Sequence, residues 1–463
     1  MRFKDVLDST GAMLVRGDAD RLVHGVSTDT RTLQPRALYL ALSGPNFDGN
    51  AFARQAEERG AGGLLLRAGS DLPLGELPSD APVAVHDAPL RALSDLASWH
   101  RARLSIPVVG ITGSCGKTTT KNILRQLLEP HLSVVASPAS FNNDVGVPHT
   151  LLLADPDTQA LVVEVGTNAP GEIAGLCRVA RPTIGVITNI GASHLEKLGS
   201  IDGVAREKSA LFASLPPDGL AVLNLDCRYA AELRSATRAR VVTISVEGEG
   251  DFDATDLWFH SGGTTFKLQG HEVTSPLIGS HNVYNLLAAL AAATGMGLSL
   301  EELLPAVSRL EGGKRRMERR QFGALTVFDD SYNANPDSAR AAVRVLEGLH
   351  GSGRRVMVLG DMLELGDDAP ELHHGIGCAA ARADIDLLLL VGETTRATAA
   401  GALECGLAPE RVRHLGSPAE ALEQVADLVR AGDIVLVKGS RRMGLDRLVD
   451  RLGEAFGGDA GAR

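Results

Sequence analysis

Short apolar, β-branched runs recur along most of the chain and alternate with segments whose apolar residues repeat every three to four positions. The runs predict strands of a parallel sheet that is buried on both faces, and the periodic segments predict helices that cover it. This alternation is typical of an α/β fold. The predicted strands are 37–42, 108–111, 160–165, 183–188, 219–224, 325–328, 355–359, 386–391, 412–415 and 433–437.

The helices and one antiparallel excursion follow from the same pattern. Apolar periodicity predicts helices at 50–60, 87–104 and 281–294, and Asn335 is a suitable N-cap for a helix that begins at Pro336. A polar alternating stretch from Asp253 to Val273, with a glycine pair at its centre, predicts a small antiparallel hairpin.

A chain of 463 residues is long enough for about three domains of roughly 150 residues each. We expect a small α/β domain at 1–86 and a central domain with a mostly parallel sheet at 87–312. The strand and helix pattern restarts after the glycine pair at 312 and 313, so residues 313–463 are predicted to form a doubly wound, Rossmann-like domain.

Composition excludes several classes of protein. The net charge is −11, from 46 basic and 57 acidic residues, which argues against nucleic-acid binding through a basic face. No apolar run is long enough to span a bilayer and the first residues lack a signal segment, so we expect a cytoplasmic protein without stable membrane insertion. The five cysteines are far apart without any Cys-x-x-Cys, which indicates neither a zinc site nor a disulfide framework.

The segment from Val108 to Thr120 has the order strand, glycine-rich loop and helix that a phosphate-binding loop requires. Gly113 and Gly116 allow the backbone to approach an anion, and the amides of residues 114–118 are expected to point at it from the start of a helix. Lys117 would contact the outer phosphates and the Thr118 hydroxyl would bind Mg²⁺. The predicted ATP-binding residues here are Gly113, Ser114, Cys115, Gly116, Lys117, Thr118 and Thr119.

The glycine spacing in this loop departs from the general pattern, because position 111 is isoleucine and the glycines stand at 110, 113 and 116. Cys115 lies inside the loop. A helix N-terminus and a neighbouring lysine favour a thiolate, so Cys115 is predicted to react faster than the other cysteines.

Polar residues gather where predicted strands end, which is where ligands bind in parallel sheets. Glu164 ends one strand, and His194 follows the next; a carboxylate and a histidine near a phosphate loop can hold divalent cations, although structural hydrogen bonding is the alternative. The segment 329–336 is denser in polar groups than a turn needs. Lys438 ends the last strand, where a solvated basic turn is the alternative.

Two polar clusters interrupt the first domain, at 27–31 and 44–49. Their hydroxyls, carboxylate and arginine suit a diphosphate-sugar ligand, whereas an ordinary capped turn is the competing interpretation. The candidate residues are Ser27, Thr28, Arg31 and Asp48.

Together these segments resemble the Mur ligase family, ATP-dependent amide-forming enzymes of bacterial cell-wall synthesis, over essentially the whole chain. The phosphate loop has the family's glycine spacing. Segments 141–148, 164–173 and 329–338 resemble the subtype that adds D-alanyl-D-alanine to UDP-N-acetylmuramoyl-tripeptide, and the Asp-Asn-Pro-Arg tetrad of relatives that add diaminopimelate is absent from the sequence. Asn50 departs from the subtype, which usually has histidine there.

The resemblance implies an N-terminal domain for the UDP-sugar, a central ATPase, and a C-terminal domain that closes over the site. It implies ATP and two Mg²⁺ as cofactors, an acyl-phosphate intermediate, and small-molecule partners only; a monomer is expected. Metal-binding roles fall on Thr118, Glu164, His194 and a carbamylated Lys208, and catalytic roles on Lys117, Glu164, His194 and Lys208.

The remaining site residues also come from the resemblance. Nucleotide contacts fall on Asn282, Asn285, Arg316 and Asp330, with Arg315 as an alternative to Arg316. Substrate contacts fall on Asn142, Asn143, Asn168, Tyr332, Asn333, Asn335 and Lys438. Two rival functions stay open, a related ligase such as a folylpolyglutamate synthase with another amine acceptor, and a P-loop ATPase that performs no ligation. The third residue of the peptide, diaminopimelate or lysine, is also open.

Overall fold

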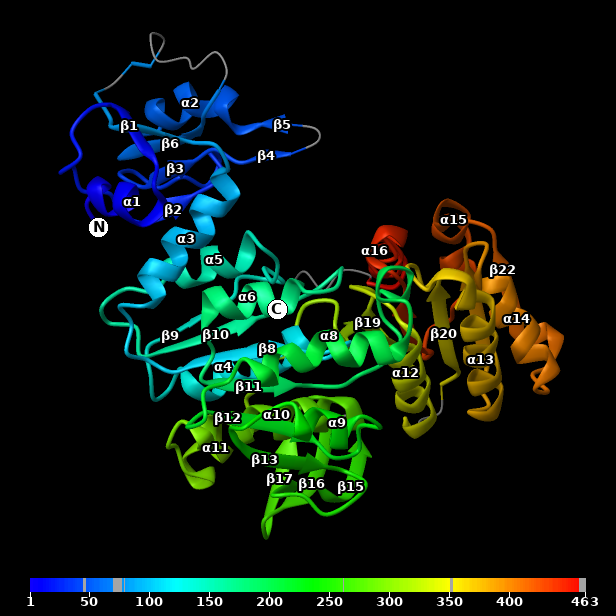
Figure 1. Ribbon diagram of the computed structural model, residues 1–463. Helices are drawn as coiled ribbons and strands as arrows, with labels where there is room; N and C mark the ends of the chain where they lie inside the picture. The colour runs from blue at the N-terminus through cyan, green and yellow to red at the C-terminus, as the bar shows by residue number, and fades with distance from the viewer. Residues whose placement is uncertain (45–46, 70–76, 79, 261, 350–352, 458–463) are drawn as a thin grey trace, which may run out of the picture.

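The computed structural model describes residues 1–44, 47–69, 77–78, 80–260, 262–349 and 353–457. Three α/β lobes follow one another along the chain, with the first and third attached to different sides of the central one (Figure 1). The predicted α/β class is confirmed. Residues 45 and 46 of the polar cluster at 44–49 lie outside the described residues.

The first lobe contains a five-stranded sheet in the order β1-β7-β6-β3-β2, in which only β1 is antiparallel to its neighbour. The predicted helix at 50–60 is divided into a 3₁₀ turn and a shorter α-helix. The elements are α1 (Phe3–Thr10), β1 (Met13–Arg16), β2 (Val26–Ser27), β3 (Leu38–Leu40), β4 (Ser43–Gly44), β5 (Phe47–Asp48), η1 (Gly49–Phe52), α2 (Ala53–Glu58), β6 (Gly63–Arg67) and β7 (Val83–His86).

The central lobe contains a seven-stranded parallel sheet in the order β14-β13-β12-β11-β8-β10-β9. Its strands are β8 (Val108–Thr112), β9 (Val134–Ala136), β10 (Ala160–Glu164), β11 (Ile184–Ile187), β12 (Leu220–Asn224), β13 (Arg240–Ser245) and β14 (Phe252–Asp253). The predicted antiparallel excursion is confirmed as the sheet β15 (Thr255–His260), β16 (Gly263–Leu268) and β17 (His271–Ser275).

Helices cover both faces of the central sheet, as its apolar strands require. One group of helices packs with an apolar cluster on one face of the sheet, and a second group packs with another apolar cluster on the opposite face. The first group is α3 (Pro89–Arg101), α5 (Gly146–Leu152), α6 (Glu172–Ala180), α8 (Ile201–Ala213) and α9 (Ala230–Ser235), with α7 (Leu195–Leu198) before α8. The second is α4 (Lys117–Leu128), α10 (Ser280–Gly295) and α11 (Leu300–Val307).

Helix α3 joins the first two lobes into one apolar core. Leu93 and Leu96 of α3 are fully buried in the same cluster as Phe3 of the first lobe and Val147 of the central lobe. The end of the first lobe is therefore not a flexible linker but a packed helix.

The third lobe contains a six-stranded sheet in the order β18-β19-β23-β20-β21-β22, with α12, α13 and α14 on one face and α15 and α16 on the other. Its elements are β18 (Glu318–Phe322), β19 (Leu325–Asp330), α12 (Pro336–Gly348), β20 (Arg355–Gly360), η3 (Gly366–Asp368), α13 (Ala369–Arg382), β21 (Leu387–Val391), α14 (Thr395–Glu404), η4 (Pro409–Arg411), β22 (Val412–Leu415), α15 (Pro418–Leu428), β23 (Ile434–Lys438), η5 (Arg441–Met443) and α16 (Asp446–Phe456).

Two details of this lobe bear on the sequence predictions. Asn335 is confirmed as the N-cap of α12, because its Oδ1 accepts from the Ser338 amide at 2.8 Å. The expectation that no cysteines pair is wrong, since Cys378 of α13 and Cys405, directly after α14, form a disulfide with a Cα separation of 5.1 Å. Their partnership depends on how the two helices pack, which cysteine spacing in sequence does not reveal.

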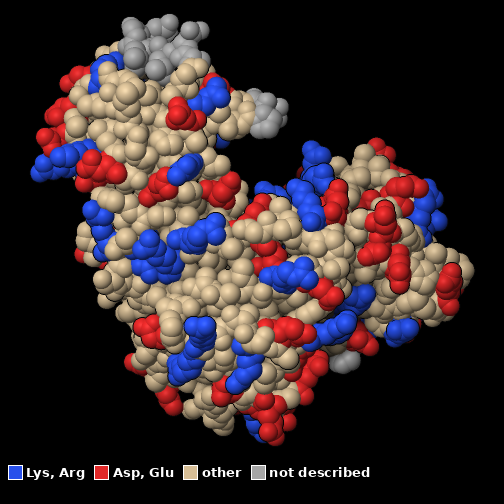
Figure 2. Space-filling model, in the orientation of Figure 1, with Lys and Arg blue, Asp and Glu red and all other residues tan. Residues whose placement is uncertain are grey.

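The surface in Figure 2 carries acidic and basic side chains interspersed over all three lobes, with a hollow between the first and third lobes. Among the described residues no helix combines the length and the apolar character needed to cross a membrane.

Candidate active site

The carboxyl ends of β8, β10 and β11 meet at the edge of the central sheet where α4 begins, and the third lobe lies against this edge (Figure 1). Because these strands are parallel neighbours, the polar residues that follow them converge. The candidate site is built at this meeting of two lobes.

The phosphate loop has the backbone that the glycine spacing predicts. Gly113 and Gly116 have φ of 152° and 84°, values that favour glycine. A Cβ at Gly113 would overlap Thr188 Oγ1, and one at Gly116 would overlap Asn285 Oδ1, so both glycines also permit close packing. Helix α4 begins at Lys117, so its first-turn amides are free of intrahelical partners and can bind an anion.

The amides of residues 114–118 were expected to point at the anion, but two of these five amides donate to Asn189 instead. The Ser114 amide donates to Asn189 O at 3.0 Å and the Cys115 amide donates to Asn189 Oδ1 at 2.8 Å. The Ser114 hydroxyl donates to Gly191 O at 2.9 Å. The first half of the loop is therefore fastened to the segment after β11, a role of Asn189 that the sequence analysis missed.

Burial shifts the pKa of both Lys117 and Cys115 in the phosphate loop. The Lys117 ammonium donates to Gly113 O at 2.6 Å, and burial lowers its pKa. Burial also raises the pKa of the Cys115 thiol to about 11, in spite of the neighbouring Lys117. Desolvation of the charged form outweighs the nearby cation, so a thiolate is not favoured at Cys115, and its reactivity relative to the other cysteines stays a prediction.

Glu164 is the centre of a hydrogen-bonded group at the end of β10. Its two carboxylate oxygens accept from Thr118 Oγ1 and from Asn142 Nδ2, both at 2.8 Å. Arg316, from the third lobe, donates to Thr118 Oγ1 at 3.0 Å, whereas Arg315 pairs with Asp446 at 2.7 Å. Of the two arginines, Arg316 is the one that the structure brings to the phosphate loop.

The charge of Lys117 in the loop acts on two further candidates, His194 and Lys208. His194 is the N-cap residue of α7, and its pKa is lowered by burial and then by the charges of Lys117 and Lys208. Lys208 on α8 is 1% exposed, and burial, followed by the charge of Lys117, lowers its pKa well below the usual value. Lys208 is therefore not a solvent-exposed surface lysine.

The third lobe contributes a second polar group around Asp330 at the end of β19. Lys438 at the end of β23 donates to Asp330 Oδ2 at 2.6 Å and to Asn333 O at 3.1 Å. The alternative of a solvated basic turn is wrong for Lys438, which is 2% exposed. Asn333 itself is exposed.

Two further contacts join this group to the central lobe. The hydroxyls of Tyr332 and Ser140 are 2.6 Å apart, and Asn335 Nδ2 is 3.4 Å from Ser114 O. The Arg316 guanidinium stacks 3.9 Å from the centroid of the Tyr332 ring. The expected approach of the third lobe to the phosphate loop is thus present in this arrangement.

Asn282 and Asn285 share a face of α10, as predicted, and Asn285 Nδ2 donates to Asn282 Oδ1 at 3.2 Å. Asn285 Oδ1 also accepts from Thr120 at 3.1 Å, which ties α10 to α4. The sequence analysis missed His281, whose Nδ1 is buried without a hydrogen-bond partner. Burial lowers the pKa of His281 to about 4, and the charges of Asp330 and Lys438 act on it in opposite directions.

The remaining predicted site residues of the central lobe have more local roles. Asn143 Oδ1 accepts from the Gly146 amide at 2.9 Å at the start of α5, and Thr119 is half-buried on α4. The Asn168 amide donates to Glu172 Oε2 at 2.6 Å, and its side chain is exposed. Lys121 was missed; its ammonium donates to Ser137 O at 2.7 Å below the loop.

The N-terminal candidates are bonded within their own lobe. Ser27 Oγ donates to Asp29 O at 2.9 Å, and Arg31 pairs with Asp29 at 2.7 Å. Asp48 caps η1 through the Asn50 amide at 3.1 Å, and Thr28 is half-buried. The β4–β5 hairpin that carries Asp48 projects from the first lobe on the side of the third lobe (Figure 1).

The donor set fits Mg²⁺ held jointly with phosphates. Within the described ranges no three His, Cys, Asp or Glu side chains gather as a metal cluster. Mg²⁺ is usually bound by one or two protein oxygens together with substrate phosphates and water, and the Thr118 hydroxyl beside the Glu164 carboxylate offers such oxygens.

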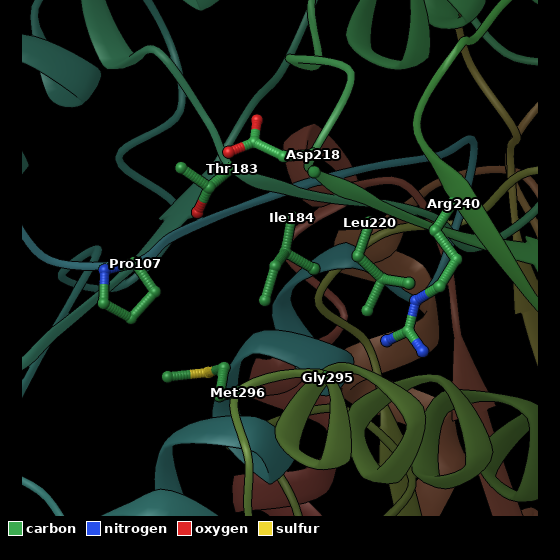
Figure 3. A pocket seen from close by; sticks show the side chains of 9 residues that line it. Pro107, Thr183, Ile184, Asp218, Leu220, Arg240, Gly295 and Met296 are labelled. Carbon is green, nitrogen blue, oxygen red and sulfur yellow. The ribbon is translucent and has the colours of Figure 1, made fainter.

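A cavity of about 300 Å³ lies at the opposite, amino-terminal edge of the central sheet (Figure 3). Its lining includes Pro107, Thr183, Asp218 and Arg240, which precede or begin β8, β11, β12 and β13. None of the predicted site residues lines it.

Comparison with known proteins identifies all three lobes. Residues 22–91 match the Mur ligase family catalytic domain, residues 111–293 the Mur ligase middle domain, and residues 315–441 the Mur ligase glutamate ligase domain. The UDP-N-acetylmuramoyl-tripeptide--D-alanyl-D-alanine ligase of Bacillus subtilis is 36% identical over 437 residues, with 94% of each chain covered. The ligase of the same name from Escherichia coli is 36% identical over 447 residues, covering 94% of this chain and 95% of its own.

Solved structures of Mur ligases are also similar to this chain. MurF from Acinetobacter baumannii superposes with a TM-score of 0.87 at 30% identity, covering 98% of both chains. MurF from Thermotoga maritima, solved in complex with ADP, shares the fold with a TM-score of 0.81 at 24% identity. Similarity of this extent, over three matched domains, shows that the chain belongs to the Mur ligase family.

Proposed function

We propose that this chain is an ATP-dependent ligase that adds D-alanyl-D-alanine to UDP-N-acetylmuramoyl-tripeptide and forms ADP and phosphate, in peptidoglycan precursor synthesis. The names of relatives that match nearly its whole length support this substrate pair. The observation that carries the proposal is the hydrogen bond from Arg316 of the third domain to Thr118 of the phosphate loop, because it brings a cation from a second domain to the proposed nucleotide site.

The reaction must make a carboxylate into an acyl donor, since hydroxide is a poor leaving group. Transfer of the γ-phosphoryl group gives an acyl phosphate, which an amine then attacks with loss of phosphate. Lys117 and Arg316 are cations beside the phosphate loop and offset the repulsion between triphosphate and carboxylate. Two Mg²⁺ would neutralise phosphate charge, with Thr118 and Glu164 at one ion and Glu164, His194 and Lys208 at or near the second.

Lys208 is proposed to be carbamylated. A buried ammonium beside Lys117 is unfavourable, whereas the neutral amine can add CO₂ and become an anion that binds metal. Glu207, the adjacent residue, accepts from the Gly171 and Ile173 amides at 2.6 and 2.8 Å, and its carboxylate is already committed to the start of α6. Because the Glu207 carboxylate is already hydrogen-bonded in this way, Lys208 is the one of these two adjacent residues whose side chain is available to bind metal.

The remaining predicted site residues are assigned to the nucleoside, the UDP-sugar or the two peptides. Asn282, Asn285 and Asp330 are proposed to bind the nucleoside, and Ser27, Thr28, Arg31 and Asp48 the UDP-sugar. The peptide end of the substrate and the dipeptide are assigned to the hollow between the first and third lobes (Figure 2). Their proposed contacts are Asn142, Asn143, Asn168, Tyr332, Asn333, Asn335 and Lys438. We also propose that the enzyme works in the cytoplasm, as a monomer, with domain boundaries near 86 and 312.

Phosphate release measured with UDP-muramoyl-tripeptide, with and without D-alanyl-D-alanine, tests this function. Phosphate should form only when ATP, the tripeptide and the dipeptide are all present. Rapid ATP hydrolysis with neither peptide would contradict ligation. A parallel series of amine acceptors distinguishes the dipeptide from the single amino acids that related ligases use.

A further inference from the structure

Glu364 carries a carboxylate from the C-terminal domain to His194 of the central domain. Its Oε2 lies 3.1 Å from His194 Nδ1, and the two side chains are 51% and 28% exposed. Glu364 stands in the loop between β20 and η3, far in sequence from every motif in the sequence analysis. The contact exists only when the two domains are together.

The loop that carries Glu364 is held firmly on both sides. The Met362 amide donates to His373 Nε2 at 3.0 Å, and the Leu363 amide donates to Ser440 Oγ at 2.9 Å. Leu365 is 3% exposed in the core of the C-terminal domain. Glu364 itself has φ of 65°, a left-handed backbone that side chains rarely adopt, between these anchors.

His194 is attached to the phosphate loop from its own side. The preceding Ser193 hydroxyl donates to Ser114 Oγ at 2.9 Å, and His194 has φ of 52° where α7 begins. The imidazole therefore has a fixed backbone at the phosphate loop but a ring orientation that depends on what its Nδ1 meets.

Apolar packing supports the same contact. Leu372 of α13 packs against the cluster of Ala192, Leu195, Leu198 and Val204, which surrounds α7. Gly366 also approaches α7, where a Cβ would lie 4.0 Å from Glu196 Cα. The loop and α13 thus dock on α7 as a unit when the domains close.

We infer that Glu364 is a positioning residue that orients His194 from the opposite domain, so that domain closure completes the metal site. A carboxylate that accepts from Nδ1–H fixes the tautomer whose Nε2 carries a lone pair, as carboxylate partners of metal-bound histidines do. The inference rests on the proposed role of His194 near the second Mg²⁺. With Glu364 in this role, the site of the second Mg²⁺ is complete only after the C-terminal domain has docked.

The test compares Glu364→Ala and Glu364→Gln with wild type. The matched control is Glu404→Ala, because Glu404 forms a similar pair with His374 at 2.8 Å in the same domain and away from the site. Mn²⁺ affinity is measured by electron paramagnetic resonance with a non-hydrolysable ATP analogue and the UDP-tripeptide. Turnover and KM for the tripeptide are measured in parallel, and small-angle scattering reports domain closure.

Glu364→Ala should weaken Mn²⁺ binding and lower kcat by about 10- to 100-fold, with KM for the tripeptide within about twofold of wild type. Glu364→Gln, which keeps an acceptor oxygen, should recover most of the loss, and Glu404→Ala should match wild type. In a His194→Ala background, Glu364→Ala should have no further effect.

Unchanged Mn²⁺ affinity in Glu364→Ala would overturn the inference, and so would a loss that persists in the His194→Ala background. Altered closure in scattering with normal Mn²⁺ affinity would also overturn it, since Glu364 would then be a latch between domains. A wild-type chain that does not ligate the two peptides contradicts the proposed function instead, and the Mn²⁺ comparison remains valid in that case.

Discussion

Two polar clusters of this chain, one in the N-terminal domain and one between the central and C-terminal domains, are bonded in opposite ways. In the first, Asp29 holds both Ser27 and Arg31, each two positions away. In the second, Thr118 bonds Glu164, 46 positions away, and Arg316, 198 positions away. Residues of both clusters were named as binding candidates from the sequence.

The difference concerns what each cluster needs in order to form. A turn whose side chains bond to neighbouring residues satisfies its polar groups at small entropic cost and requires no ligand. A cluster assembled from three distant segments must overcome the loss of conformational entropy in all of them. We therefore expect substitutions between the domains to affect the reaction strongly and substitutions in the N-terminal turn to affect it weakly.

Lys117→Ala should have the largest effect. The substitution removes a half-buried cation from the phosphate loop, and phosphate release should fall by about 10³-fold or more. Lys314→Ala, an exposed lysine at the domain boundary, is the control and should keep normal turnover. Activity of Lys117→Ala within tenfold of wild type would remove the phosphate loop from the mechanism.

Lys208→Ala should come next, with a loss of about 10²- to 10³-fold while the protein remains folded. Millimolar formate or acetate should restore part of the activity, because a small carboxylate can occupy the position of the carbamate. Lys197→Ala, an exposed lysine on the neighbouring α7, should show neither the loss nor the rescue. Near-normal turnover in Lys208→Ala would refute carbamylation, and mass spectrometry under CO₂ would check the modification directly.

The sequence predicted those parts of the fold that depend on local pattern. The long apolar runs at β10, β11 and β21 are fully buried strands, and the Asn335-Pro336 pair starts α12 as expected. The N-terminal sheet was largely missed, because strands as short as β2 have two residues and show no periodicity. Strand β18 was missed because its Glu-Arg-Arg sequence, suited to a sheet edge, reads as a loop.

The candidate site shows the same limit. Glycine spacing identified the phosphate loop, and strand ends identified Glu164 and Lys438. Asn189 directly follows the predicted strand 183–188, but nothing in the sequence indicates its bond to Cys115. Glu364 carries no such signal at all, because its contact with His194 forms only when the C-terminal domain is docked. Arg316 also contacts a residue across a domain boundary, but it was expected only from the family resemblance, so local pattern alone does not find such residues.

Gly191→Ala tests the domain interface itself and should have an intermediate effect. A Cβ at Gly191 would overlap Asp337 Oδ2 of the C-terminal domain, so the domains could not close fully and kcat should fall by about 10- to 100-fold. Adding Asp337→Ala removes the overlapping carboxylate and should recover part of the loss. In Gly175→Ala, the control, the new Cβ lies 3.7 Å from its nearest neighbour and should be tolerated. Equal turnover in Gly191→Ala and wild type would show that this contact is absent during the reaction.

Arg31→Ala should have the smallest effect, and it tests whether the N-terminal turn binds the UDP-sugar at all. The Arg31 side chain is 83% exposed and pairs with Asp29, so its removal should leave thermal stability nearly unchanged. If the guanidinium contacts the diphosphate, KM for the UDP-tripeptide should rise by about two- to fivefold, KM for ATP should stay constant, and the rise should shrink at high salt. Arg54→Ala is the control, because Arg54 is an exposed arginine of the same domain that pairs with Glu58 at 2.9 Å. If Arg31→Ala and Arg54→Ala have the same KM for the UDP-tripeptide, the N-terminal turn does not bind the UDP-sugar. Of the two clusters, only the one between the domains then serves the reaction.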